Sequence, residues 1–519
     1  MKLYKYIAIA LIISLTGSCS EWLDLRPESE IVLEDYWQTE AQATSVLSAG
    51  YRALTLPAAI DRMIVWGELR SDNVTEGSGT PQDLLRIMNV NITPTNPYAD
   101  WGVFYEIINY CNTFLYYAPE VVKRDQNFTE SKLHQMEAEA LAIRAFAYFY
   151  LVRAFRDVPL VLEPSIHDMQ EYDEPKSTER QVIDQIISDL LKARQTARAD
   201  YGKGAYNKGR FTRNAISALL ADVYLWDQQY ANCIAMCGEI LNDKTLKLVE
   251  GDKVINEVFN LGNSRESIFE LQFDKDIQPN YTVNNVYGYS GVPAGQLSFP
   301  LFLTSKGNFS PFNYAASAVK ESTEDIREDH SVGTAVNGTG YSILKYAVIN
   351  VTENADGTFT PRYRTSAATT NWVVYRLSDV MLMKAEALVQ LSANSEQNFR
   401  EALTLVNTTY LRSNETADSL NFTTYATQSD MEKLVLRERQ REFLFEGKRW
   451  FDLLRVVRRK GDPSSILAYL SPKLSGDNMQ LKRLSVIDGL YMPILKSELD
   501  INLNLKQNPF YEDENFVNQ

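Results

Sequence analysis

The sequence predicts a mostly α-helical chain in which a scaffold of stacked two-helix units is interrupted by a loop-rich, partly β insert. Three observations predict this fold class. Long segments show the period of about 3.6 residues that marks amphipathic helices, such segments occur in pairs separated by short turns, and one long stretch lacks that period. The chain has 519 residues, of which 45% are hydrophobic, so it can bury a large core.

The helical spacing is clearest in three segments. Apolar side chains recur at intervals of three and four within residues 137–155, 215–227 and 376–391. After a short turn, the second and third of these segments are each followed by a further helical segment, 230–241 and 397–412. Helix pairs of this length, with alanine and aromatic side chains at the crossing, resemble tetratricopeptide units. We therefore expect a tetratricopeptide-like helical repeat scaffold.

Residues 251–372 have a different composition from the rest of the chain. They are rich in Asn, Gly, Thr, Ser, Pro and Tyr, and they contain short strand-like runs such as 267–273. Their aromatic content argues against disorder. We therefore expect one domain over residues 19–519, with an N-terminal helical part to about residue 250, the loop-rich insert over 251–372, and a C-terminal part over 373–519.

The start of the chain predicts export and a lipid anchor. Two lysines precede an apolar run over residues 6–15 that is too short to span a bilayer, so residues 1–18 have the pattern of a cleaved signal peptide. Small residues then precede Cys19, as in the lipobox of bacterial lipoproteins, although Thr16 holds the place where that pattern usually has leucine. We expect acylation of Cys19 and attachment to the membrane by this anchor alone, with plain secretion as the alternative.

Charge and cysteine content exclude several classes of partner and site. The net charge is -15 and the pI is about 4.9, so nucleic acid is not expected as a partner. Beyond Cys19, only Cys111, Cys233 and Cys237 remain, which is too few for a disulfide framework. Cys233 and Cys237 share a helix face, but no nearby His or Cys would complete a zinc site. We expect buried thiols and predict neither a metal nor a cofactor.

No catalytic motif is present in the sequence. The chain lacks a nucleophile elbow, a zinc-protease motif, a phosphate-binding loop and a dinucleotide fingerprint, and its three histidines are scattered. A glycosidase needs only two carboxylates, and among 67 acidic residues no pair is informative. The residues alone therefore indicate no catalytic site, and they leave a surface glycosidase as an alternative.

The densest charged motif covers residues 437–453. Glu438, Glu442 and Glu446 are spaced by four, so they share one helix face, and Arg441 and Arg449 lie within one turn of them. One interpretation is a site for an anion. The other is a structural lattice of charge-assisted hydrogen bonds beneath aromatic side chains. We favour the lattice, because alternating charges on a helix usually pair with one another.

This motif resembles the C-terminal signature of the SusD/RagB family, the nutrient-binding outer-membrane lipoproteins of Bacteroidetes. Further matches follow the order of the family along nearly the whole chain. They are residues 19–24, which resemble the mature start, then 49–54, 68–73, 101–112, 139–159, 375–387, 493–494 and 507–509, after which Phe510 replaces the usual glycine.

The resemblance implies the function. Members of the family are noncatalytic, have a tetratricopeptide-like scaffold, and carry the ligand site in a loop-rich region. They lie at the cell surface over a SusC-like TonB-dependent outer-membrane transporter. The resemblance therefore implies a lipoprotein that captures oligosaccharide and delivers it to such a transporter. A RagB-like component that binds peptide is the nearest alternative, and an adaptor that binds protein through a broad apolar face is a more distant one.

Candidate ligand-binding residues are aromatic and polar side chains in the loops. Sugar rings stack on aromatic faces while Asn, Asp and Arg bind the hydroxyls, and loops on a rigid scaffold are where such residues concentrate. The candidates are Asp72, Asn73, Tyr98, Tyr287, Tyr289 and Trp372. Trp66 and Trp101 come next, although the helical spacing around Trp101 favours core packing.

Overall fold

The computed structural model describes residues 36–166, 173–304, 309–312, 325–336, 338, 340–366, 369–474 and 478–512. The expected signal peptide and Cys19 lie outside the described residues. Among the helices that are described, none is long and apolar enough to cross a membrane.

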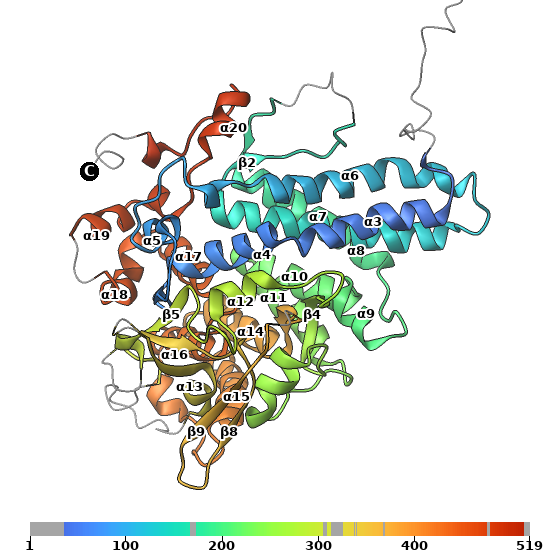
Figure 1. Ribbon diagram of the computed structural model, residues 1–519. Coiled ribbons are helices and arrows are strands. Elements are labelled where there is room, and N and C mark those ends of the chain that lie inside the picture. Colours follow the sequence, from blue (N-terminus) through green and yellow to red (C-terminus); the bar gives the residue numbers. More distant parts are fainter. Residues whose placement is uncertain are drawn as a thin grey trace, which may run out of the picture.

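The scaffold is a row of helices in which each helix packs against the next (Figure 1). In chain order these are α3 (Glu40–Leu54), α6 (Gly102–Val122), α7 (Glu130–Phe155), α8 (Glu179–Thr196), α10 (Arg213–Trp226), α11 (Tyr230–Leu241), α14 (Leu377–Leu391), α15 (Glu396–Ser413) and α16 (Gln428–Glu442). The three segments with clear helical spacing form α7, α10 and α14, and the second helices of the expected pairs are α11 and α15. The mostly α, tetratricopeptide-like class is therefore confirmed.

Threonine side chains begin five of these helices. The hydroxyl groups of Thr39, Thr129, Thr178, Thr212 and Thr427 accept hydrogen bonds from backbone N–H groups in the first turns of α3, α7, α8, α10 and α16. In α3 and α8 a glutamine in the first turn also accepts from the backbone of the capping threonine, which completes a capping box. Each cap satisfies backbone donors that have no partner within the helix.

Shorter elements surround the scaffold. Before the insert they are α4 (Pro57–Ile64), the π-helical turn η2 (Val65–Leu69), β1 (Thr75–Glu76), α5 (Gln82–Met88), β2 (Val158–Pro159), β3 (Lys176–Ser177) and α9 (Gly204–Gly209). The insert contains β4 (Ser267–Leu271), α12 (Tyr281–Tyr287), β5 (Leu297–Pro300), α13 (Ile326–Ser331), β6 (Val332–Val336), β7 (Gly340–Ile343), β8 (Val348–Glu353), β9 (Phe359–Tyr363) and the start of β10 (Trp372–Arg376). The C-terminal part ends with α17 (Arg449–Lys460), α18 (Leu467–Leu470), α19 (Asn478–Leu484) and α20 (Lys496–Ile501).

Strand pairing joins the insert to both helical parts. A four-stranded antiparallel sheet has the order β1-β5-β7-β6, so β1 from the N-terminal part pairs with β5 of the insert, Thr75 opposite Ser298. A second antiparallel pair joins β4 to β10, with Trp372 opposite Leu271. β10 leads directly into α14, so this pair links the insert to the scaffold.

One continuous hydrophobic core contains side chains from all three parts of the chain. Nearly every residue of α7 from Ala138 onward is buried, because this helix has α6 on one side and α8 on the other. Cys111, Cys233 and Cys237 are free thiols buried in the same core, as the sequence predicted.

Two glycines allow a close backbone contact between the N-terminal and C-terminal parts. Gly67 in η2 lies against Gly447, which lies within the charged motif and has a left-handed backbone with φ of 68°. A Cβ atom at position 67 would overlap the carbonyl group of Gly447. Only glycine fits at position 67 without displacement of backbone.

We predict that Gly67→Ala lowers the free energy of unfolding by about 1–3 kcal/mol or more, because the added methyl group must displace backbone. The matched control is Gly238→Ala within α11, where an added Cβ meets no atom within 4 Å. That control should be neutral or raise stability by up to about 1 kcal/mol, because alanine is the better helix former. Urea denaturation of both variants measures the difference, and equal midpoints would contradict the close approach.

Candidate ligand-binding site

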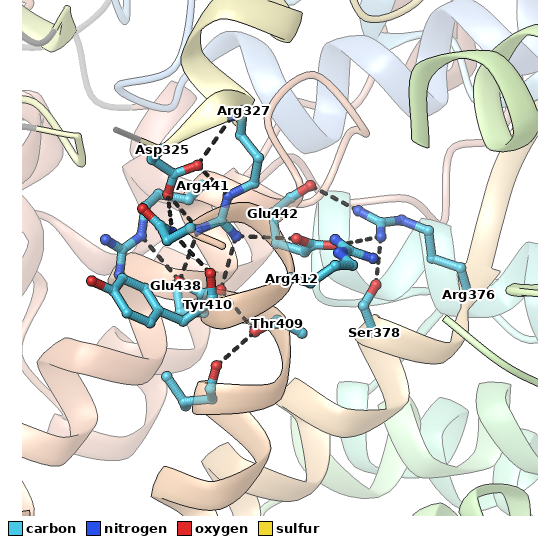
Figure 2. Close-up of polar contacts among 12 residues, drawn as sticks. Asp325, Arg327, Arg376, Ser378, Thr409, Tyr410, Arg412, Glu438, Arg441 and Glu442 are labelled. Carbon is cyan, nitrogen blue, oxygen red and sulfur yellow. Dashed lines mark hydrogen bonds and ion pairs between the residues drawn. The ribbon is translucent and has the colours of Figure 1, made fainter. Parts of the chain in front are cut away.

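The charged motif forms a buried lattice, drawn in Figure 2. Glu442 accepts hydrogen bonds from Arg376 and Arg412, and from Arg327 at 3.1 Å. Glu438 pairs with Arg327 at 2.8 Å and with Arg441 at 3.0 Å. All of these side chains are buried. Because opposite charges face one another in the interior, the structural interpretation of this motif is confirmed.

The lattice is balanced in charge. It contains the carboxylates of Glu266, Asp325, Glu438, Glu442 and Glu446 and the cations of Arg327, Lys345, Arg376, Arg412 and Arg441. Burial alone would raise the pKa of Glu442, but Arg412, Arg376 and Arg327 together hold it well below its usual range. Glu442 is therefore ionised at neutral pH.

A second buried ion pair contains two of the predicted ligand-binding residues. Asp72 accepts two hydrogen bonds from Arg449, at 2.8 and 2.9 Å, and one from Gln440. The amide group of Asn73 donates to Glu68 at 2.8 Å and accepts from Gln440 at 2.9 Å. Asp72 is 2% exposed and Asn73 is fully buried. Their prediction as ligand contacts is wrong, because their polar groups are used to join the N-terminal part to α16 and α17.

Trp372 and Tyr287 are also buried. Tyr346 lies between them, with ring centroids 5.3 Å from Trp372 and 5.5 Å from Tyr287, and all three rings are nearly parallel. The hydroxyl group of Tyr287 donates to the carbonyl oxygen of Phe445. The prediction that Trp372 and Tyr287 contact a ligand is wrong for this structure, because both side chains are buried and Tyr346 covers one face of each ring.

No described tryptophan can serve as a platform for a ligand. All of them are at most 2% exposed, including Trp66 and Trp101, the next candidates from the sequence. Trp66 stacks on Phe104, and Trp101 meets Phe155 edge to face. Any aromatic platform formed by the described residues must therefore be built from other rings.

Tyr98 and Tyr289 are half-buried and keep part of their rings exposed. The guanidinium of Arg62 lies 5.2 Å from the centroid of the Tyr98 ring, and Tyr289 forms a short bridge with Val292. Residues 75–80, which precede Tyr98 in the chain, meet residues 296–298, which follow Tyr289, because β1 pairs with β5 and the hydroxyl group of Thr80 donates to the carbonyl oxygen of Gln296 at 2.7 Å. Contact of Tyr98 and Tyr289 with a ligand stays a prediction.

A groove of about 560 Å³ lies beside α3. We call it the α3 groove. The elements that line it, α3, α9 and β4, are labelled in the right half of Figure 1. One wall comes from α3 and the residue after it: Thr44, Ser45, Ser48, Ala49, Tyr51, Arg52 and Thr55. The other wall comes from the end of α9, the end of β4 and the loop that follows: Gly209, Leu271, Gln272 and Gln278. Its size is that of a small-molecule site.

Tyr51 fixes one part of the groove wall. Its hydroxyl group donates to Glu139 at 2.7 Å and accepts from the backbone of Phe211 at 2.9 Å. Arg210 binds the same Glu139 carboxylate through two hydrogen bonds, at 2.7 and 2.8 Å. Burial, followed by the charge of Glu139, raises the pKa of Tyr51 well above its usual value, so this hydroxyl stays protonated.

Two glutamines line the α3 groove, and two exposed tyrosines lie close to its lining residues along the chain. The amide of Gln278 donates to the carbonyl oxygen of Thr55 at 3.0 Å, which joins the two walls. Gly209 allows Gln272 to approach, since a Cβ there would lie 2.6 Å from the Gln272 side chain. Tyr206 and Tyr281 are 49% and 57% exposed, and each is three residues from a lining residue.

Sequence reasoning missed the α3 groove. Its α3 wall belongs to a helix whose spacing indicates only a scaffold, and the groove exists because β4 and α9 lie opposite. The one available signal was Tyr281, in the aromatic-rich insert.

Comparisons with known proteins give the family. A model of the SusD family matches residues 312–511, and a model described as "Starch-binding associating with outer membrane" matches residues 21–225. SusD-like protein P38 of Formosa agariphila is 27% identical over 503 residues, which is 88% of this chain and 92% of that protein. The chain belongs to the SusD/RagB family. A SusD-like protein of Bacteroides ovatus is 23% identical to this chain, and the match covers 91% of this chain and 85% of that protein.

Solved structures share the fold of this SusD/RagB member. A SusD superfamily protein from Bacteroides thetaiotaomicron superposes with a TM-score of 0.69 at 22% identity, over 92% of this chain and 99% of its own. A structure titled "Laminarin binding SusD-like protein" gives a TM-score of 0.66 at 23% identity, and the match covers 92% of this chain and 100% of that one. The chain is therefore a member of a family of nutrient-binding proteins associated with the outer membrane.

We predict that Glu442→Gln lowers the free energy of unfolding by about 3–5 kcal/mol, because it leaves buried guanidinium groups without their counter-charge. The control is Glu396→Gln on the surface of α15, where the pair with Arg400 is exposed and screened by water. Urea denaturation of both variants measures the difference. A loss in Glu442→Gln no larger than in the control would show that the lattice does not stabilise the fold.

The lattice also predicts the pH dependence of stability. The folded pKa values of Glu442 and Glu446 are lowered, and that of Asp379 is about 2 with Lys448 and Arg439 beside it. Their contribution is complete above the ordinary carboxyl pKa of about 4 and is lost as the pH falls through the folded values. Stability should therefore decline between about pH 4.5 and pH 2, less steeply in Glu442→Gln.

Proposed function

We propose that this SusD/RagB member captures oligosaccharides at the surface of the outer membrane and delivers them to a SusC-like TonB-dependent transporter. The observation that carries the proposal is the α3 groove, with its hydroxyl, amide and guanidinium groups and with Tyr206 and Tyr281 close by along the chain. The family is one of nutrient-binding proteins, and one structural relative is titled as laminarin-binding.

The chemistry of the α3 groove suits a sugar. Hydroxyl groups of Ser45 and Ser48 and the amides of Gln272 and Gln278 exchange hydrogen bonds with sugar hydroxyls. Exposed tyrosine rings offer a flat apolar surface to the C–H face of a sugar ring. These groups bind and orient a ligand. Among the described residues, no group of three or more His, Cys, Asp or Glu side chains is placed to hold a metal ion.

Delivery requires that the protein stay at the membrane. We propose that the thiol of Cys19 carries the lipid anchor after cleavage of residues 1–18. The acidic surface, with a net charge of -15, gives no electrostatic attraction to anionic lipids, so the acyl chains supply the attachment.

We predict that Cys19→Ala abolishes incorporation of labelled palmitate and releases the protein from the membrane fraction. Cys111→Ala is the control, because that thiol is buried in the folded chain and should not affect labelling. Unchanged labelling of Cys19→Ala would refute the anchor.

We predict that Tyr281→Ala weakens oligosaccharide binding by roughly 5- to 150-fold, the equivalent of about 1–3 kcal/mol for one ring stacked on an aromatic face. A glycan array on the mature chain selects the ligand, and calorimetry measures the dissociation constant. Tyr116→Ala on α6 is the control, since Tyr116 is equally exposed but no residue of α6 lines the α3 groove, whereas Tyr281 follows the lining residue Gln278 by three positions. The ligand should be unchanged after long incubation, as expected for a protein that is not an enzyme.

The same measurement on Tyr98→Ala and Tyr289→Ala locates the site. If these two variants lose binding and Tyr281→Ala does not, the ligand is bound by the loops around Tyr98 and Tyr289 rather than in the α3 groove. Binding of peptides alone would favour the RagB-like alternative and contradict the proposal.

A further inference from the structure

The lining of the α3 groove differs in charge from the rest of the protein. The chain has 67 acidic and 52 basic residues, yet no acidic side chain lines this groove and one basic side chain, Arg52, does. An anionic ligand is repelled by most of an acidic surface, but a groove with a lone cation and no carboxylate in its lining provides a local exception.

Arg52 has no ion-pair partner among the described residues. It lies in the last turn of α3, its side chain is exposed, and it makes no ion pair or hydrogen bond with another described residue through its guanidinium. The nearby buried acid, Glu139, is already paired with Arg210 and bonded to Tyr51. Arg52 is therefore not needed to neutralise an internal carboxylate.

The acids nearest along the opposite wall do not supply that partner. Glu270, which precedes Leu271, is fully buried and accepts hydrogen bonds from the backbone of Asn263 and the amide of Asn371. Asp274 accepts hydrogen bonds from the backbone N–H groups of Asp276 and Ile277, within its own turn. Asp276 is exposed, and neither aspartate lines the groove. The guanidinium of Arg52 thus keeps its planar set of donors available, and this geometry matches two oxygens of a carboxylate or a sulfate.

The groups around Arg52 are neutral. Ser48 precedes Arg52 by one helical turn on the same wall, and Gln272 and Gln278 stand on the other wall. Hydroxyl and amide groups can both donate hydrogen bonds to sugar hydroxyls and accept hydrogen bonds from them. One cation among neutral hydrogen-bonding groups fits a polyhydroxylated ligand that places one negative charge in the groove, against Arg52.

We propose that the α3 groove binds an acidic oligosaccharide, with a carboxylate or sulfate group of one sugar on Arg52 and the hydroxyls on Ser48, Gln272 and Gln278. This inference rests on the proposed function and specifies its class of ligand. The lone cation selects acidic over neutral glycans, because only the acidic member of such a pair gains the charge-assisted hydrogen bonds.

The test uses a glycan array of matched pairs on the mature full-length protein. Uronic acid oligosaccharides are printed beside their methyl esters, and sulfated galactan oligosaccharides beside their desulfated forms. Within each pair the anionic group is masked or removed while the sugar backbone is the same, and the two sets separate a carboxylate from a sulfate. We expect the acidic member of at least one pair to bind at least 10-fold more tightly than its neutral partner, and salt at 0.5 M to reduce that preference.

Three variants then test whether Arg52 causes the preference for acidic glycans. Arg52→Gln should weaken the acidic ligand by about 10- to 100-fold and leave the neutral partner unchanged, because it removes only the charge-assisted bonds. Arg52→Lys keeps the charge but not the planar guanidinium, so its affinity for the acidic ligand should lie between those of the parent and Arg52→Gln. Gln278→Ala should weaken both members. Since Arg52 is exposed, equal thermal midpoints are expected for its variants and the parent.

The outcomes separate this inference from the proposed function. If neutral glycans bind as well as acidic ones, or if Arg52→Gln leaves acidic binding intact, the acidic specificity is overturned while capture of oligosaccharides stands. If no glycan of either kind binds, the proposed function fails as well.

Discussion

Arg376 and Glu442 form the contact on which the rest of the structure depends. Glu442 ends α16, and Arg376 ends β10, so their pairing fixes the last strand of the insert against the C-terminal scaffold. Arg376 also binds Glu446 at 2.8 Å and Glu266 at 2.8 Å, and Glu266 immediately precedes β4. One guanidinium therefore holds both strands of the β4–β10 pair. The end of β4 supplies Leu271, which is followed by Gln272, and both residues line the α3 groove.

Burial makes this contact decisive. A guanidinium in the interior loses its hydration and is tolerated only when carboxylates and carbonyl groups replace the lost water. Here Lys345 and Arg327 bring further cations from the insert to Glu446 and Glu438. A shift of the insert by one residue would leave several buried charges unpaired at once. The lattice thus specifies one arrangement of insert and scaffold, which in turn sets the width of the groove.

The scaffold was predictable from the sequence, because helices such as α7, α10 and α14 are indicated by apolar side chains at intervals of three and four residues. That Glu438, Glu442 and Glu446 pair with basic side chains was predictable from the alternation of charge. Their expected common helix face is wrong for Glu446, because α16 ends at Glu442. Most of their partners were not predictable, since Arg327, Lys345, Arg376 and Arg412 come from other elements. Burial of Trp372 was not predictable either, since it depends on Tyr346 and on a strand partner about a hundred residues away. Asp72 likewise pairs with Arg449, far along the chain. The α3 groove lies between elements that are distant in sequence, so no local pattern indicates it.

Hydrogen exchange followed by mass spectrometry on the native protein tests most directly whether the lattice binds the insert and the scaffold into one unit. The account predicts that backbone amides of β4, β10 and α16 exchange through the same opening, with free energies close to that of global unfolding. Fast exchange of β4 and β10 beside slow exchange of α16 would contradict it, because the insert would then open independently of the charges that are held to fix it.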